Sequence, residues 1–172
     1  MKKLLVMLLA AILVLSATAF AATYNYDNDI TFEYDDKALE ITFEEHKDEE
    51  DRIILGFKDA AWDDGYITIQ VQDIEDGDHF PTNEEIAKEI NVDVSALETL
   101  ASWGNFTNVV TATFTTDDFT ETMFFAPVTD DDGEVEDILT VVVGTTAIEN
   151  EEIATQRDDA ISTIIDTLKV DD

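Results

Sequence analysis

ITFEYDDKALEITF, residues 30–43, carries the pattern that sets the fold class. Apolar residues take every second position on both sides of a short turn at residues 35–37: Ile30, Phe32, Tyr34, Leu39, Ile41 and Phe43. The positions between them are mostly acidic or threonine. A period of two with one apolar and one polar face is typical of half-buried antiparallel strands. The stretch therefore predicts two strands that each place these apolar side chains in the core.

Similar signals continue through the chain. Further strands are predicted at residues 52–58 and 66–74, with Asp63-Asp64-Gly65 as the hairpin turn between them. Three later segments are rich in Val, Thr and Phe, and they predict strands at residues 109–115, 121–128 and 137–144. Within the last one, residues 141–143 are all valine, which predicts a central strand covered on both faces.

A first helix is predicted to begin after Thr82, which forms a capping box with Glu85. Its apolar stripe consists of Ile86, Ile90, Leu97 and Ala101. The sequence SWGN, residues 102–105, is predicted to end it at Gly104. A second capping pattern at residues 95–98 leaves open a break near Asn91.

A second helix is predicted from about Glu151, with Asn150 as its cap. One face carries Ile153, Ala160, Ile161, Ile164, Ile165 and Leu168. The predicted order is therefore ββββαβββα, an α+β fold in which two main helices pack on an antiparallel sheet. We expect a single α+β domain over residues 22–172.

The first 21 residues have the features of a secretory signal peptide. Lys2 and Lys3 precede an apolar run at residues 4–15, and small residues lead to a predicted cleavage site between Ala21 and Ala22. The run is shorter than the ~20 residues of a membrane-spanning helix. We therefore expect a protein that is secreted or lies in the cell envelope, without membrane insertion after cleavage. The chain has 0 cysteines, so its core alone must hold the fold.

The charge of the chain limits its partners. Lys and Arg number 9 and Asp and Glu number 41, and removing Lys2 and Lys3 with the leader gives 7 − 41 = −34. A field of this sign repels nucleic acids and anionic lipids, and it favours cations or basic proteins. Adaptation to a salty environment would explain the acidity equally well. The 45% of hydrophobic residues argues for a folded core rather than disorder.

The acidic stretch at residues 130–136 is the candidate metal site. Its possible ligands are Asp130, Asp131, Asp132, Glu134 and Glu136. Aligned on Gly133, however, the helix-loop-helix calcium pattern would need acids where Val128 and Leu139 stand. The stretch therefore predicts a hairpin turn, with a weak, irregular calcium site as the alternative. No other cofactor is expected.

Catalytic residues are not marked by any motif. The two histidines, His46 and His79, are expected in separate acidic loops at the surface, and the many carboxylates do not single out a pair. Trp62 and Trp103 lie beside predicted turns, where each could cover an end of the core or line a ligand site. These residues favour a non-enzymatic role without deciding it.

Several stretches together resemble the PsbP-like fold, which is found in extrinsic photosynthetic proteins and in many secreted bacterial domains. They are ITFEYDD and ALEITF near the start, NEEIAKEI at residues 83–90, TVVVG at residues 140–144 and ISTIIDTLKV at residues 161–170. The resemblance implies a layered sandwich and a non-catalytic binding or accessory role. We therefore expect a secreted, highly acidic binding or accessory domain. The alternatives are a small extracellular hydrolase with a carboxylate site and a weak extracellular calcium-binding domain.

Overall fold

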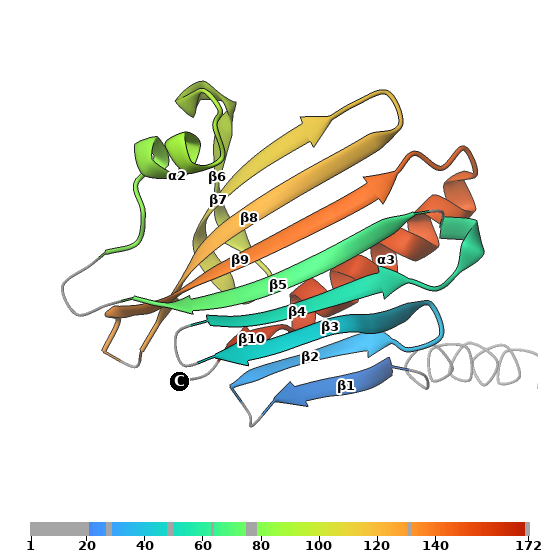
Figure 1. The fold of residues 1–172 in the computed structure, drawn as a ribbon, viewed down its shortest axis with the longest axis horizontal. Helices are drawn as coiled ribbons and strands as arrows, with labels where there is room; N and C mark the ends of the chain where they lie inside the picture. Colours follow the sequence, from blue (N-terminus) through green and yellow to red (C-terminus); the bar gives the residue numbers. More distant parts are fainter. Residues whose placement is uncertain are drawn as a thin grey trace, which may run out of the picture.

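The computed structural model describes residues 21–26, 29–47, 50–62, 64–74, 79–130 and 132–170. These residues form an α+β structure of antiparallel sheets and two α-helices (Figure 1). The larger sheet has seven strands in the order β3-β4-β5-β9-β8-β7-β6, which span Leu39–Lys47, Glu50–Phe57, Gly65–Asp73, Val135–Thr146, Phe119–Thr129, Phe106–Thr115 and Leu97–Trp103. The smaller sheet has the order β1-β2-β10, which span Ala21–Tyr26, Ile30–Asp35 and Lys169–Val170. The helices are α2 (Asn83–Glu89) and α3 (Glu151–Thr167), and the short 3-10 turns are η1 (Ala60–Trp62) and η2 (Val94–Ala96).

The core joins the large sheet, the small sheet and α3. In Figure 1, α3 runs behind the large sheet, and it packs against β2 of the small sheet. One cluster of buried residues includes Phe32, Ile53, Leu55, Ile67, Ile69, Leu139, Val141, Ile164 and Leu168. Burying such side chains is the main source of stability in a chain without disulfides. The predicted amphipathic helix at the C-terminal end is thus confirmed as part of the core.

The first helix is shorter than predicted. Its capping box is confirmed, because the Thr82 hydroxyl accepts from the Glu85 N–H at 3.4 Å and the Glu85 carboxylate accepts from the Thr82 N–H at 2.8 Å. The helix ends at Glu89, and Asn91 has a φ of 57° that interrupts helical geometry. The break near Asn91 is therefore confirmed.

The continuation of the helix through Leu97 and Ala101 is wrong. Both residues lie on β6, where Leu97 pairs with Ala112 of β7. A spacing of four residues places two side chains on one face of a helix and also on one face of a strand. The spacing of Leu97 and Ala101 therefore does not show which of the two elements forms. The SWGN stretch likewise ends no helix, because Trp103 pairs with Phe106 and the chain reverses between them.

Three strands, β1, β6 and β10, were not predicted, so the order ββββαβββα is incomplete. The Asp63-Asp64-Gly65 turn also differs from the prediction. Gly65 already belongs to β5 and pairs with Thr145, while η1 lies in the connection from β4. Asp63 lies outside the described residues.

A bulge in β3 changes which face Phe43 occupies. Ile41 pairs with Leu55 and Phe43 pairs with the adjacent Ile54, so Thr42 is an extra residue. The Thr42 hydroxyl donates to the Ile54 carbonyl at 3.1 Å. An extra residue reverses the alternation beyond it. The prediction that Phe43 faces the core is therefore wrong, and this side chain is 43% exposed.

The turn at residues 35–37 is confirmed, and it passes the chain from the small sheet to the large one. The Asp35 carboxylate accepts from the Lys37 N–H at 2.9 Å, and the Asp35 carbonyl accepts from the Ala38 N–H at 3.1 Å. Within the described residues, no helix combines the length and the hydropathy that crossing a bilayer requires.

Candidate functional site

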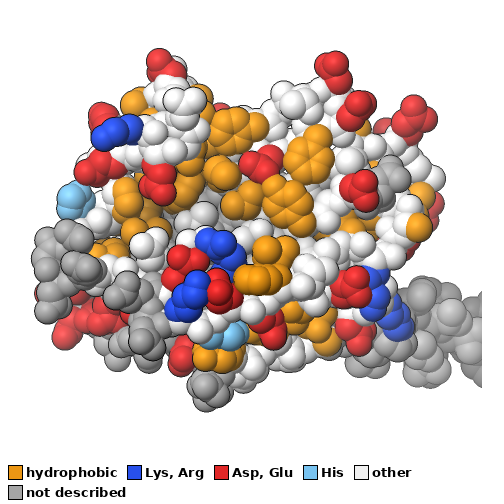
Figure 2. Space-filling model, viewed as in Figure 1, with side chains coloured by type: hydrophobic (Ala, Val, Ile, Leu, Met, Phe, Trp, Pro, Cys, Tyr) orange, Lys and Arg blue, Asp and Glu red, His pale blue; other side chains and the backbone are white. Residues whose placement is uncertain are grey.

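The face of the large sheet opposite α3 is the main candidate site, and we call it the open face. On β5, Ile67, Ile69 and Val71 point into the core, so Tyr66, Thr68 and Gln70 take the other face. Figure 1 shows α2 near one end of this face and no described helix over its middle. Hydrophobic side chains gather there in Figure 2. The half-buried members are Ile54, Tyr66, Phe114, Phe119, Met123, Phe125 and Val142, and Phe43 is exposed.

Strand register places one apolar row across the middle of the open face. The paired positions are Phe43, Ile54, Thr68, Val142, Met123 and Ala112, on β3, β4, β5, β9, β8 and β7. Neighbouring strands lie ~4.8 Å apart, so five spacings make a row about 24 Å long. The row extends onto β3 only because the bulge at Thr42 brings Phe43 to this face.

Beside this row, two aromatic rings lie over a glycine. Tyr66 pairs with Gly144, and Gly144 pairs with Glu121. The rings of Tyr66 and Phe119 stack with centroids 6.3 Å apart. A Cβ at Gly144 would lie 2.7 Å from atoms of both rings, so only glycine permits this arrangement.

Glu121 brings a carboxylate into the aromatic part of the open face. Its Oε2 accepts a hydrogen bond from the Tyr66 hydroxyl. Burial, and then the bond to Glu121, raise the pKa of Tyr66 to about 12. The phenol therefore remains a neutral donor at physiological pH. A carboxylate has about four acceptor positions, so the bond to Tyr66 leaves acceptor capacity for a ligand.

The neighbouring polar part of the open face contains two ion pairs. Arg52 lies 2.9 Å from Glu50 and donates to the Gln70 amide oxygen at 3.1 Å. Lys47 lies 2.8 Å from Glu45. The charge of each of these cations is therefore balanced by a neighbouring carboxylate. The charge of Glu121 is not balanced in this way, because its hydrogen bond comes from a neutral phenol.

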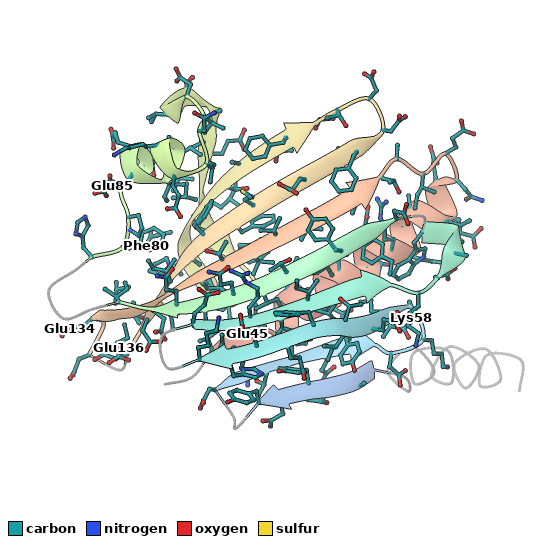
Figure 3. The ribbon with its side chains drawn as sticks, viewed as in Figure 1. Glu45, Lys58, Phe80, Glu85, Glu134 and Glu136 are labelled. Carbon is teal, nitrogen blue, oxygen red and sulfur yellow. The ribbon has the colours of Figure 1, made fainter. Side chains whose placement is uncertain are left out.

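A hollow of about 450 Å³ lies where α2 meets the open face. It is lined by Gln72, Asp73, Ile74, His79, Pro81, Glu85, Glu89 and Ile138. Figure 3 shows Phe80 and Glu85 on the segment that leads into and forms α2. Hydrogen bonds from Thr82, followed by the charge of His79 at 3.6 Å, lower the pKa of Glu85. This carboxylate already serves as a helix cap, so it is a poor candidate for a general acid.

The predicted acidic stretch forms the β8–β9 hairpin, which confirms the hairpin turn. The Asp130 carboxylate accepts from the Glu134 N–H at 2.8 Å, and the Asp130 carbonyl accepts from the Gly133 N–H at 3.1 Å. Gly133 has a φ of 85°. Asp132 and Glu134 are exposed, Glu136 is half-buried, and Figure 3 places Glu134 and Glu136 beside the turn.

Asp131, the remaining candidate ligand, lies outside the described residues. Among the residues that are described, the structure brings together no group of three or more His, Asp or Glu side chains with metal-binding geometry. The weak calcium site stays a prediction, which a comparison of metal ions can test.

His46 does not lie in a surface loop, contrary to the prediction. It is on β3, and its Nδ1 lies 2.9 Å from the Asp51 carboxylate. Its ring stacks on Tyr26 with centroids 3.5 Å apart, and its Nε2 lies 3.4 Å from the Tyr24 hydroxyl. The histidine therefore ties β1 of the small sheet to the edge of the large one. His79 is exposed, in agreement with the prediction for that residue.

Both tryptophans pack on the core. Trp62 is 4% exposed and meets Phe57 edge-on, with centroids 5.6 Å apart. Trp103 is half-buried and stacks on Phe124 at 4.1 Å. The sequence left open whether each tryptophan covers the core or lines a ligand site, and the geometry supports covering the core.

The sequence did not predict the open face, because apolar residues on both faces of a strand were interpreted as a sign of full burial. Residues 141–143 predicted a strand covered on both faces, and β9 is indeed the central strand of the large sheet. Val141 is buried, but Val142 is half-buried on the open face, so full coverage is wrong. In β8, Met123 and Phe125 alternate with Phe124 and Ala126, and apolar residues in both phases were the available signal.

No protein-family model, curated protein or solved structure matches this chain. The functional argument therefore rests on the geometry and chemistry of the open face.

Proposed function

We propose that this chain is a secreted, non-enzymatic binding domain and that the open face is its binding surface. One observation carries the proposal: aromatic and aliphatic side chains from neighbouring strands of the open face are only half-buried and gather in one area. Soluble proteins rarely leave large continuous apolar areas in water unless a partner covers them. A regular sheet also holds such side chains rigidly, which reduces the entropy cost of binding.

Several carboxylates around the open face have structural roles, which favours binding over hydrolysis. Glu50 pairs with Arg52, Glu85 caps α2, and Glu121 holds Tyr66. A glycosidase would need two carboxylates aimed at one bond across a sugar. The hollow beside α2 has acids on its walls, but Glu85 is already bound by Thr82.

Secretion is proposed from the leader at residues 1–21. The first strand begins at Ala21, next to the predicted cleavage site, so cleavage would remove almost none of β1. Mass spectrometry of the processed protein is expected to give an N-terminus at Ala22. Recovery of the intact chain on membranes would contradict this proposal.

Met123 offers a direct test of the binding surface. The methionines are Met1, Met7 and Met123, so after the predicted cleavage Met123 is the only one, and it lies in the middle of the open face. Methyl NMR of the processed protein would follow it during titration with three probes: a cationic amphipathic peptide, a neutral amphipathic peptide and a β-glucan oligosaccharide. Thr155→Met adds a control methyl on the exposed side of α3.

The expected result is a saturable shift of the Met123 methyl with at least one probe, while the control methyl does not move. Saturation separates specific binding from a general solvent effect. If none of the three probes moves Met123 at millimolar concentration, the open face is not the binding surface that we propose.

A further inference from the structure

We infer that the open face binds a cationic amphipathic segment of a partner protein. The segment would place its apolar side chains on the accessible part of the row, from Phe43 to Met123, and a basic side chain on Glu121. This inference rests on the proposed function, and it adds the chemistry of the partner.

The apolar row fits a helix-sized occupant. Ala112 at one end is buried, so the accessible row from Phe43 to Met123 covers four strand spacings, about 19 Å, or roughly 13 residues of α-helix at ~1.5 Å per residue. The row is built mainly from Phe, Ile, Val and Met side chains, and Met123 lies toward its β8 end. A thioether chain is flexible and polarisable, so it can adjust to the shape of an apolar stripe.

The charge of Glu121 specifies a basic partner. Its carboxylate lies in the aromatic part of the open face, and its bond from the neutral Tyr66 hydroxyl does not cancel the negative charge. A Lys or Arg that approached with an apolar segment could form a charge-assisted hydrogen bond there. Partial exclusion of water by the surrounding rings would strengthen this bond.

The margin of the open face is negatively charged, like Glu121. Figure 2 shows acidic side chains around much of the hydrophobic area, and Lys47 and Arg52 near it are each paired with an acid. The whole processed chain has 7 basic residues, because Lys2 and Lys3 leave with the leader, and 41 acidic residues. A second copy of this chain would bring the same negative field against the face, which opposes self-association.

The test compares three synthetic peptides of 18 residues against the processed protein. The first has Leu on one helical face and Lys on the other, the second has the same composition in scrambled order, and the third has Glu in place of Lys. We expect the Leu/Lys helix to bind about ten times more tightly than either control, with the Met123 methyl shifting at saturation. Raising the NaCl concentration from about 50 to 500 mM should weaken its binding severalfold.

Glu121→Gln isolates the charge, because the amide oxygen can still accept from Tyr66. We expect about a three- to tenfold loss of affinity for the Leu/Lys helix. Glu98→Gln is the matched control, since Glu98 is an exposed acid on β6 whose register position lies on the opposite face of the sheet. Its affinity should stay within about twofold of the parent. Circular dichroism of both variants would show that the fold is retained.

The outcomes separate the two proposals. Equal affinity for the helix and the scrambled peptide, or an unchanged affinity in Glu121→Gln, overturns the inference because charge or apolar area alone would then explain binding. Saturable shifts at Met123 with only the neutral peptide or the oligosaccharide would leave the proposed function standing and overturn the cationic partner. Dimerisation in sedimentation experiments that blocks the Met123 shift would assign the face to a second copy instead.

Discussion

The hydroxyl of Tyr66 on β5 donates a hydrogen bond to the carboxylate of Glu121 on β8, across the intervening strand β9. Gly144 lies between them and has no side chain to separate the pair. The bond fixes a charged group in an otherwise apolar area. It also makes the stability of the protein sensitive to ionisation of the phenol.

Alkaline pH should therefore destabilise the protein through Tyr66. The pKa of Tyr66 is raised from 10.0 to about 12, so the fold favours the neutral phenol. This contribution is complete below pH ~10 and is lost as pH rises toward ~12. Because the ring is partly exposed, we expect a loss of about 1 kcal/mol in the free energy of unfolding. Urea titrations at several pH values would measure it.

Tyr66→Phe is expected to cost about 1 kcal/mol at neutral pH, because it removes the hydrogen bond to Glu121. The same variant should lose less stability than the parent above pH ~10. Burial, followed by the charge of Glu44, also raises the pKa of Tyr24, so part of the alkaline loss should remain. A variant whose alkaline loss equals that of the parent would contradict the assignment to Tyr66.

Ile164→Ala should strongly destabilise the fold. Ile164 lies on α3, is 1% exposed and belongs to the core cluster. Removing such a side chain leaves a cavity and costs about 2–5 kcal/mol. Ser162→Ala on the same helix is the control, because Ser162 is exposed and alanine favours helix. Chemical denaturation would compare the two, and an equal effect would show that α3 is not anchored as described.

Gly104→Ala and Gly133→Ala form a matched pair. Both glycines have positive φ, 56° and 85°, so alanine would be strained at either position by about 1–2 kcal/mol. A Cβ at Gly104 would also lie 2.5 Å from the Ile165 carbonyl oxygen, whereas nothing lies within 4 Å of one at Gly133. Gly104→Ala should therefore have a distinctly lower melting temperature than Gly133→Ala. Similar melting temperatures would contradict the close packing of the β6–β7 turn on α3.

Calcium and magnesium should stabilise the protein equally at matched ionic strength. Asp130 uses its carboxylate to accept from the Glu134 N–H, and this is a turn interaction. A true extracellular-type site with Kd near 1 mM would add roughly 1.4 kcal/mol at ~10 mM calcium, or about 3–6 °C in melting temperature. Thermal melts in high NaCl would compare the two ions. A calcium-selective rise that Asp130→Asn with Asp132→Asn abolishes would establish the metal site.

Local sequence signals predicted the elements whose evidence is contained in one segment. The cap at Thr82, the stripe of α3 and the alternation around Phe32 all depend on neighbouring residues, and the structure confirms them. The prediction of a helix at Leu97 was wrong because its spacing to Ala101 fits a helix and a strand equally. Pairing with β7 decides in favour of the strand. Strand β10 has two residues, too few for any periodic signal.

The open face needed information that a single segment does not contain. Phe43 reaches it through a bulge, and Glu121 becomes notable only when β9 brings it to Tyr66. Met123 and Phe125 look like core residues until the strand order shows which face α3 covers. The candidate site is therefore a property of the register between strands, which composition and periodicity do not specify.

The junction between β5 and β9 sets an order on folding. Gly65 pairs with Thr145, which follows 145 − 65 = 80 residues later, whereas the other pairs in the large sheet join strands adjacent in sequence. Closing such distant segments is slow, so pulse-labelled hydrogen exchange should protect β3–β4 amides before β5–β9 amides. Until residues 135–146 are available, β5 has an unpaired edge that other chains could join. Aggregation through this edge is therefore a risk for the growing or partly folded chain. The risk ends when β9, in the last third of the sequence, pairs with β5.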